Sequence, residues 1–232
     1  MLTTPDPDIQ EMSTRASQVI VSLAFRFLVA VDIEGFSLRS AAEQAKVQDE
    51  LERAMSEAAA RAGLDRNRWY RQPRGDGELA VLPADANSLS LVADYPRNLA
   101  LVLAEINRPS DPGSRLRVRM AIHHGTVFPG RFGPVGGAPI IVSRLVDAQV
   151  LRQALKQRSD LDIALIVSTA VYNEVVQSGF SELDPNMFNR TNIRIKGIYY
   201  TGYVHNGIFI TRNSRVSSIT QIRDDAVAGT GA

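Results

Sequence analysis

Two aspartates, 44 positions apart, have the clearest chemical potential in this sequence. Asp32 ends the apolar segment 24–32, and Asp76 lies in the turn sequence Arg-Gly-Asp-Gly. An acid at a strand end and a second acid in a hairpin can together hold divalent metal ions against a triphosphate, and the backbone carbonyl of Ile33 is a candidate further ligand. Taken singly, each aspartate is better explained as a cap or turn former. As a pair, and together with the motifs described below, they favour metal-assisted phosphoryl transfer.

A turn follows the first aspartate directly and offers backbone amides to an anion. It is expected to lead into a helix, where partial positive charge collects and phosphate oxygens bind well. The residues predicted to bind substrate phosphates in this way are Glu34, Gly35, Phe36 and Ser37.

The elements that must position these residues follow from periodicity and turn signals. Residues 24–32 form a dense apolar run typical of a buried strand. A helix is expected at 87–106, and Pro96 should kink or split it. The order predicts an α+β fold, a mixed sheet with a ferredoxin-like βαββαβ core and flanking helices. We predict strands at 24–32, 67–73, 77–83, 115–124, 161–167 and within 191–211, helices at 8–22, 40–62, 87–106, 139–155 and 168–177, and a glycine-rich hairpin or loop at 125–137.

The composition excludes several classes of protein. The 232 residues are 44% hydrophobic, carry a net charge of +1 and include no cysteine. A nucleic-acid surface would need a basic excess, and a thiolate zinc site or a disulfide would need cysteine. No stretch reaches the ~20 apolar residues of a membrane span, and the acidic residues of the first twenty argue against a signal peptide, so a cytoplasmic protein is expected. We expect an N-terminal helical extension at 1–22, a catalytic domain at 23–212 and a tail at 213–232.

Six segments, in order along the chain, resemble the motifs of a known family. Over about residues 25–205 the chain is similar to the catalytic domain of the class III nucleotide cyclases. The segments are VDIEGFS (31–37), GDGELAVLP (75–83), LRVRMAIHHGTVFPG (116–130), IIVSRLVDA (140–148), ALIVSTAVY (164–172) and RIKG (194–197). Several ordered motifs at family spacing are far more specific than any one of them.

The resemblance implies a role for each matching residue. Asp32 and Asp76 would bind two Mg²⁺ or Mn²⁺ ions, with the carbonyl of Ile33 as a further ligand. Arg144 would stabilise charge on the α-phosphate during attack by the 3′-oxygen. Lys196 would pair with the β- and γ-phosphates. The implied product is a 3′,5′-cyclic nucleotide, released with pyrophosphate.

Departures from the family pattern bear on the base. Gln72 stands where the family reads a purine with lysine or glutamate, and Arg74 shares its strand parity with Gln72 and Asp76. A glutamine and an arginine could satisfy the carbonyls and the N–H of uracil. These features resemble the compact bacterial uridylate cyclases of Pycsar antiphage systems, which implies conversion of UTP to cyclic UMP as an infection signal. Ile140 replaces the family asparagine that positions the ribose.

The family also implies an assembly. Each of its sites forms between two domains, and this chain has both sets of residues, so a two-fold homodimer with two equivalent sites is expected. Two alternatives stay open: an adenylate or guanylate cyclase that reads its base differently, and a degenerate module that binds nucleotide without turnover, which Ile140 favours.

His123 and His124 form the remaining chemically suggestive pair. Neighbours on a strand face opposite sides of the sheet, so at most one of them could enter a given site. A structural or interface role is expected for both.

Overall fold

The computed structural model describes residues 24–108, 114–180, 183–195 and 197–206. The expected N-terminal extension, the C-terminal tail and Lys196 therefore lie outside the described residues. None of the helices in these ranges combines the length and the apolar character that crossing a membrane requires.

A mixed eight-stranded sheet forms the centre of the molecule, in the order β2-β3-β1-β4-β6-β8-β7, with β5 paired to β4. Neighbouring strands are antiparallel except β4 and β6, which are parallel. The predicted mixed sheet and its βαββαβ core are confirmed. The strands are β1 Ala24–Ile33, β2 Tyr70–Arg74, β3 Gly77–Val81, β4 Val118–Gly130, β5 Gly133–Val135, β6 Ile163–Ser168, β7 Phe188–Ile195 and β8 Ile198–His205.

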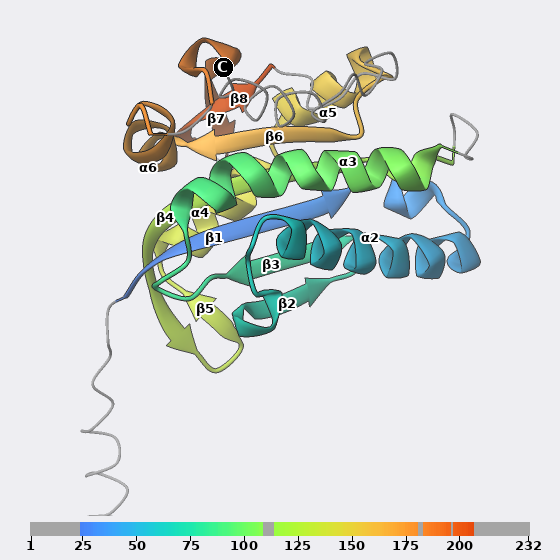
Figure 1. The fold of residues 1–232 in the computed structure, drawn as a ribbon, viewed down its shortest axis with the longest axis horizontal. Coiled ribbons are helices and arrows are strands. Elements are labelled where there is room, and N and C mark those ends of the chain that lie inside the picture. Colours follow the sequence, from blue (N-terminus) through green and yellow to red (C-terminus); the bar gives the residue numbers. More distant parts are fainter. Residues whose placement is uncertain (1–23, 109–113, 181–182, 196, 207–232) are drawn as a thin grey trace, which may run out of the picture.

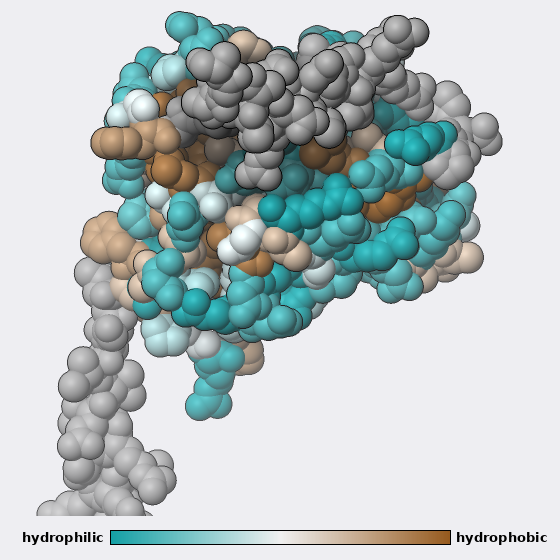
Figure 2. Space-filling model, in the orientation of Figure 1, coloured by the Kyte–Doolittle hydropathy of each residue, from teal (hydrophilic) through white to brown (hydrophobic). Residues whose placement is uncertain are grey.

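Helices cover both faces of this sheet. Figure 1 shows α2 and α3 side by side over the near face, with α4 behind the sheet. Residues of α6 join the core on the α2/α3 face, and those of α4 and α5 form the core on the other. The exposed side of α2 is mostly hydrophilic (Figure 2). The helices are α2 Ala41–Arg61, α3 Tyr95–Asn107, α4 Gly137–Val146, α5 Gln149–Gln157 and α6 Thr169–Val171.

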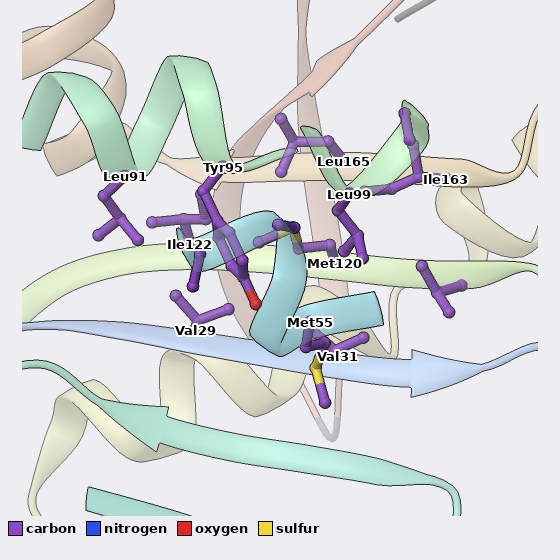
Figure 3. Packing of buried hydrophobic residues seen from close by; sticks show 14 of the residues in the cluster. Val29, Val31, Met55, Leu91, Tyr95, Leu99, Met120, Ile122, Ile163 and Leu165 are labelled. Atoms are coloured by element: carbon purple, nitrogen blue, oxygen red, sulfur yellow. The ribbon is translucent and has the colours of Figure 1, made fainter. Parts of the chain in front are cut away.

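Strand β1 is buried on both sides, as its dense apolar run predicts. Val29 and Val31 pack into the core beneath α2 and α3, whereas Leu28 and Ala30 pack into the core beneath α4. Figure 3 shows Tyr95 and Leu99 of α3 directed onto the first of these layers. The alternation places Asp32, two residues after Ala30, on the α4 face.

Two predicted helices differ in detail. The helix around Pro96 does not end there, because a π-helical segment, Ser90–Asp94, precedes α3 and accommodates the missing proline N–H. The helix predicted at 139–155 is two helices, because Ala148 is not helical (ψ 134°). A hydrophobic periodicity is the same for one long helix as for two consecutive short ones, so the sequence did not reveal this break.

Strand β2 is shorter than predicted, and the glycine-rich segment forms a hairpin. Residues 66–68 form a 3₁₀ turn, and strand β2 begins only at Tyr70. The glycine-rich segment 125–137 is the expected hairpin, in which β4 continues to Gly130 and pairs with β5.

Candidate active site

The fold brings the two predicted aspartates together at one end of β1. Asp32 lies opposite Gly77 in the β1–β3 ladder, and the amide of Ile33 donates to the carbonyl of Asp76 at 2.7 Å. Gly77 permits this approach, since a Cβ there would lie 1.9 Å from the carbonyl oxygen of Val31. The hairpin turn is thereby held against the strand end that carries the first aspartate.

Asp32 has an environment that is unusual for a carboxylate. Its side chain is only 12% exposed, and its Oδ2 accepts a hydrogen bond from Arg119 at 2.5 Å. Burial raises the pKa of Asp32, Arg119 opposes this rise, and the nearby charge of Asp76 adds to it. The other oxygen, Oδ1, is buried without a hydrogen-bond partner in the described part of the chain. A buried carboxylate oxygen without a donor is suited to a cation.

An open cleft of about 720 Å³ lies beside these residues. Asp32 does not line it, but its neighbour Ile33 and its hydrogen-bond partner Arg119 do. The cleft is lined by Asp76, by Ile33 and the turn Glu34–Ser37, and by four cationic side chains. The whole turn that was predicted to bind phosphate therefore lies in the cleft. The cations are Arg117, Arg119, Arg152 and Lys156.

The turn differs from its prediction in one respect. Gly35 adopts a left-handed conformation (φ 66°) and leads into a short 3₁₀ turn, Phe36–Leu38, rather than into a long helix. Helix α2 begins later, and a capping box between Ser40 and Glu43 satisfies its first amides. The amide of Glu34 donates to the carbonyl of Arg117 at 2.8 Å, so the amides that the turn can offer to an anion are those of Gly35, Phe36 and Ser37. They lack the aligned dipole of a long helix.

Arg119 is a site residue that the sequence analysis missed. It lies opposite Asp32 in the β1–β4 ladder and is 7% exposed, and its Nε and Nη1 have no partner among the described residues. Arginines at 115, 117 and 119 alternate with the apolar residues that were predicted to face the core. Three arginines on the second face of a central strand were the signal that could have revealed this residue.

The predicted base-reading residues lie elsewhere. Gln72 donates through Nε2 to the carbonyl of Phe132 at 3.3 Å, and Arg74 donates to Oγ of Ser143 on α4 at 3.0 Å. Neither side chain lines the cleft beside Asp76. Their shared strand parity with Asp76 predicted one common site, but Asp76 lies in the turn, where strand alternation has ended.

The predicted transition-state residue is also outside the lining of the cleft. Arg144 lies half-buried on α4 and does not line the cleft. Ile140, one turn earlier, is 53% exposed. Within one chain, the cleft therefore contains residues that were predicted to bind metal and phosphate, whereas Arg144, Gln72 and Arg74 are not among its lining residues.

The protein ligands available to a metal are few. The described residues contain no group of three or more histidine, cysteine, aspartate and glutamate side chains suited to one ion. Two carboxylates and the carbonyl of Ile33 would leave coordination positions for water and substrate oxygens, which is the arrangement that Mg²⁺ at phosphoryl-transfer sites prefers. Together with the unpartnered Oδ1 of Asp32, this donor set fits Mg²⁺ or Mn²⁺.

The histidine pair has structural contacts. Nδ1 of His123 lies 2.8 Å from Oγ of Ser168, on the α4 face. His124, on the opposite face, stacks on Phe27 and contacts Glu174 at 2.9 Å. Neither histidine lines the cleft.

Comparison with known proteins identifies the fold. No protein-family model matches the chain, and no curated protein matches its sequence. Among solved structures, the guanylyl cyclase Cya2 has a TM-score of 0.58 at 16% identity, covering 81% of this chain and 94% of its own. An adenylate/guanylate cyclase/hydrolase from Silicibacter pomeroyi has a TM-score of 0.57 at 18% identity, covering 79% and 96%.

A third structure contains a nucleotide analogue. The catalytic core of a rhodopsin-guanylyl cyclase with converted specificity, in complex with ATPαS, has a TM-score of 0.50 at 18% identity, covering 79% of this chain and 96% of its own. The chain therefore has the fold of the class III nucleotide cyclase catalytic domain.

Proposed function

We propose that this protein is a metal-dependent nucleotide cyclase. The observation that carries the proposal is the pairing of Asp32 with Asp76. The buried Oδ1 of Asp32 has no partner in the described part of the chain, and Asp76 lines a cationic cleft. The cyclase fold and the ordered motifs support the same reading. The reaction would convert a nucleoside triphosphate into a 3′,5′-cyclic nucleotide and pyrophosphate.

The residues of the cleft would bind and orient the triphosphate. Asp32, Asp76 and the carbonyl of Ile33 would hold Mg²⁺ or Mn²⁺, which when bound neutralises phosphate charge and lowers the pKa of the attacking hydroxyl. The amide of Glu34 already donates to the carbonyl of Arg117 at 2.8 Å. The amides of Gly35, Phe36 and Ser37 and the guanidinium of Arg119 belong to residues that line the same space and would fix the phosphate oxygens.

The chemical step is a displacement at the α-phosphorus. The 3′-oxygen loses its proton and forms a bond to this phosphorus, while the bond to the bridging oxygen breaks and pyrophosphate leaves. Arg144 would stabilise the charge that develops on the α-phosphate, and Lys196 would pair with the leaving phosphates. Positioning and charge stabilisation account for most of the catalysis of such reactions.

The separation of Arg144, Gln72 and Arg74 from the aspartates supports a site shared between two chains. In a two-fold homodimer each chain would give its aspartates to one site and its arginine to the other. Large apolar side chains lie exposed on the β4–β5 hairpin, at β5 and at the start of α4: Phe132 at 91%, Val135 at 51% and Ile140 at 53%. Such an apolar surface is suited to a subunit contact.

We propose that the site is specific for a nucleotide with a pyrimidine base. Because Nε2 of Gln72 donates to the carbonyl of Phe132, its Oε1 and one N–H stay available to a base. Uracil offers a matching N–H and carbonyl. UTP is therefore the proposed substrate, cyclic UMP the product, and an antiphage signal the proposed role, the last resting on the resemblance to Pycsar cyclases.

A purine substrate is the second candidate, favoured by the adenylyl and guanylyl cyclases that share the fold. A degenerate nucleotide-binding module is the third. The exposed apolar Ile140, in place of a ribose-positioning amide, is the observation in its favour.

The test is product identification from each of four nucleoside triphosphates with Mn²⁺. We expect cyclic UMP and pyrophosphate. Removing a metal ligand removes several kcal/mol of charge stabilisation, so Asp76→Asn should lower turnover by at least ~100-fold while the melting temperature changes little.

Full activity of Asp76→Asn would refute the metal role. Cyclisation of ATP or GTP alone would refute the pyrimidine assignment but leave the cyclase proposal standing. Nucleotide binding without pyrophosphate release would favour the degenerate module.

A further inference from the structure

Helix α5 is firmly held beside the cleft. Leu151 and Leu155, one turn apart, are fully buried in the core beneath the α4 face. At the other end, Arg117 donates to the carbonyl of Arg158 at 2.9 Å and to that of Leu155, and to the carbonyl of Leu161 at 2.8 Å. The same guanidinium pairs with Glu34 of the phosphate turn at 3.1 Å. Arg117 therefore ties the helix to the turn that follows β1.

This anchoring determines which side chains of α5 reach the cleft. Arg152 and Lys156 follow the two buried leucines by one position each and are four residues apart, so they lie on the same side of the helix. Both line the cleft. Arg152 has one ion pair, to Asp147 at 3.6 Å, and its side chain is 60% exposed, so little holds it away from a stronger anion.

More cations than carboxylates line the cleft. Its lining includes four cations and two carboxylates, Glu34 and Asp76. Glu34 is already paired with Arg117, and Asp32, outside the lining, is paired with Arg119. Arg119 lies 93% out of solvent, with Nε and Nη1 unpartnered in the described part of the chain. A buried guanidinium with free donors, beside two exposed cations, is suited to an anion with several charges.

We propose that Arg152 and Lys156 form the outer wall of a polyphosphate site and bind the terminal phosphates of the triphosphate substrate and of the pyrophosphate product. This inference rests on the proposed function and extends it, because the chain that supplies the aspartates also supplies these two cations from α5. A cyclic nucleotide has a single phosphodiester charge and no terminal phosphate. It does not engage α5, so the site favours the substrate over the cyclic product.

The test measures binding of inorganic tripolyphosphate to the full-length protein by calorimetry, in EDTA and at low salt. We expect the double variant Arg152→Gln/Lys156→Gln to weaken binding by at least about tenfold, because two direct charge contacts are lost. A matched control is Lys46→Gln/Arg158→Gln, which removes the same net charge outside the cleft. The control should change the affinity by less than about twofold.

A second readout is the kinetics of whichever triphosphate the protein converts. Loss of phosphate contacts remote from the reacting atoms should raise KM more than it lowers kcat. Inhibition by added pyrophosphate should weaken in parallel in the α5 double variant, and not in the control.

The outcomes separate this inference from the proposed function. Three results would overturn the inference, whether or not the protein is a cyclase. The wild type and the α5 variant could bind tripolyphosphate with equal affinity, the control could lose as much affinity as the α5 variant, or the wild type could fail to bind. If no triphosphate is cyclised but the α5 variant alone loses tripolyphosphate affinity, the anion site stands and the cyclase proposal fails.

Discussion

At the residue scale, the pairing of Asp32 with Arg119 has a consequence for binding. The arginine holds one oxygen of the carboxylate, and the other oxygen has no donor among the described residues. A triphosphate in the cleft would compete for the same guanidinium and free the carboxylate for a cation. In the proposed cyclase, binding of the nucleotide and binding of the cation would therefore favour each other.

A second residue-scale feature is the titration of His123. Burial lowers the pKa of this histidine from 6.5 to about 4, and the neighbouring His124 adds to the decrease while Glu174 opposes it. In the unfolded chain the ring binds a proton near pH 6.5, whereas in the folded chain it stays neutral until about pH 4. Stability should therefore fall as the pH drops through this window.

The variant His123→Asn keeps a hydrogen-bonding group for Ser168 and removes the titrating imidazole. The free energy of unfolding of the wild type should lose roughly 3 kcal/mol more than that of the variant between pH 7.5 and pH 4. Urea denaturation of both proteins across this range measures the difference. Parallel pH profiles would contradict the buried neutral histidine.

At the element scale, the close approach of the β2–β3 hairpin to β1 depends on Gly77. Its hydrogen occupies a space where a methyl group would lie 1.9 Å from the carbonyl of Val31. At Gly75, two positions earlier, a Cβ would meet nothing within 4 Å. A side chain at Gly77 would therefore force the backbone to move, whereas the space at Gly75 can hold one.

We predict that Gly77→Ala lowers the free energy of unfolding by roughly 3 kcal/mol, because backbone must move to admit the methyl group. It should also lower cyclase activity, since the movement separates Asp76 from Asp32. Gly75→Ala should change stability by less than about 0.5 kcal/mol and serves as the matched control. Urea denaturation and initial rates measure both effects, and equal behaviour of the two variants would count against the close packing of β3 on β1.

At the scale of the whole molecule, a single chain does not bring all the predicted catalytic residues together. The cleft contains the aspartate turn and its cations, while Arg144 lies on α4 outside it. A two-fold dimer, as proposed, is the simplest assembly in which both sets would meet, and it would create two identical sites from two incomplete ones.

Mixing inactive chains tests this arrangement. Asp32→Ala and Arg144→Ala proteins, unfolded and refolded together in equal amounts, should recover about a quarter of wild-type activity. Half of the dimers would be mixed, and each would have one intact site. The control mixes Asp32→Ala with Asp76→Ala. These lesions disable both sites of a mixed dimer, so no activity should return. Absence of recovery in the first mixture would exclude sites shared between chains.

The sequence by itself determined the elements and their order. Dense apolar runs predicted β1 and β6, the Asp-Gly signal predicted the β2–β3 hairpin, and the ordered motifs predicted the cyclase fold. These features are local, because strand and turn preferences depend on a few neighbouring residues. The adjacency of Asp32 and Asp76 was also expected, because two carboxylates that share metal ions must meet and because both lie in motifs that resemble the cyclase family.

Only the tertiary structure decided what surrounds those aspartates. Residues far apart in the chain, Arg119 of β4 and Lys156 of α5, meet at the cleft because strand pairing and the burial of Leu151 and Leu155 place them there. Strand parity could not predict where Gln72 and Arg74 point relative to Asp76, because parity ends at the turn. Non-local packing sets these positions, and no single segment of sequence encodes them.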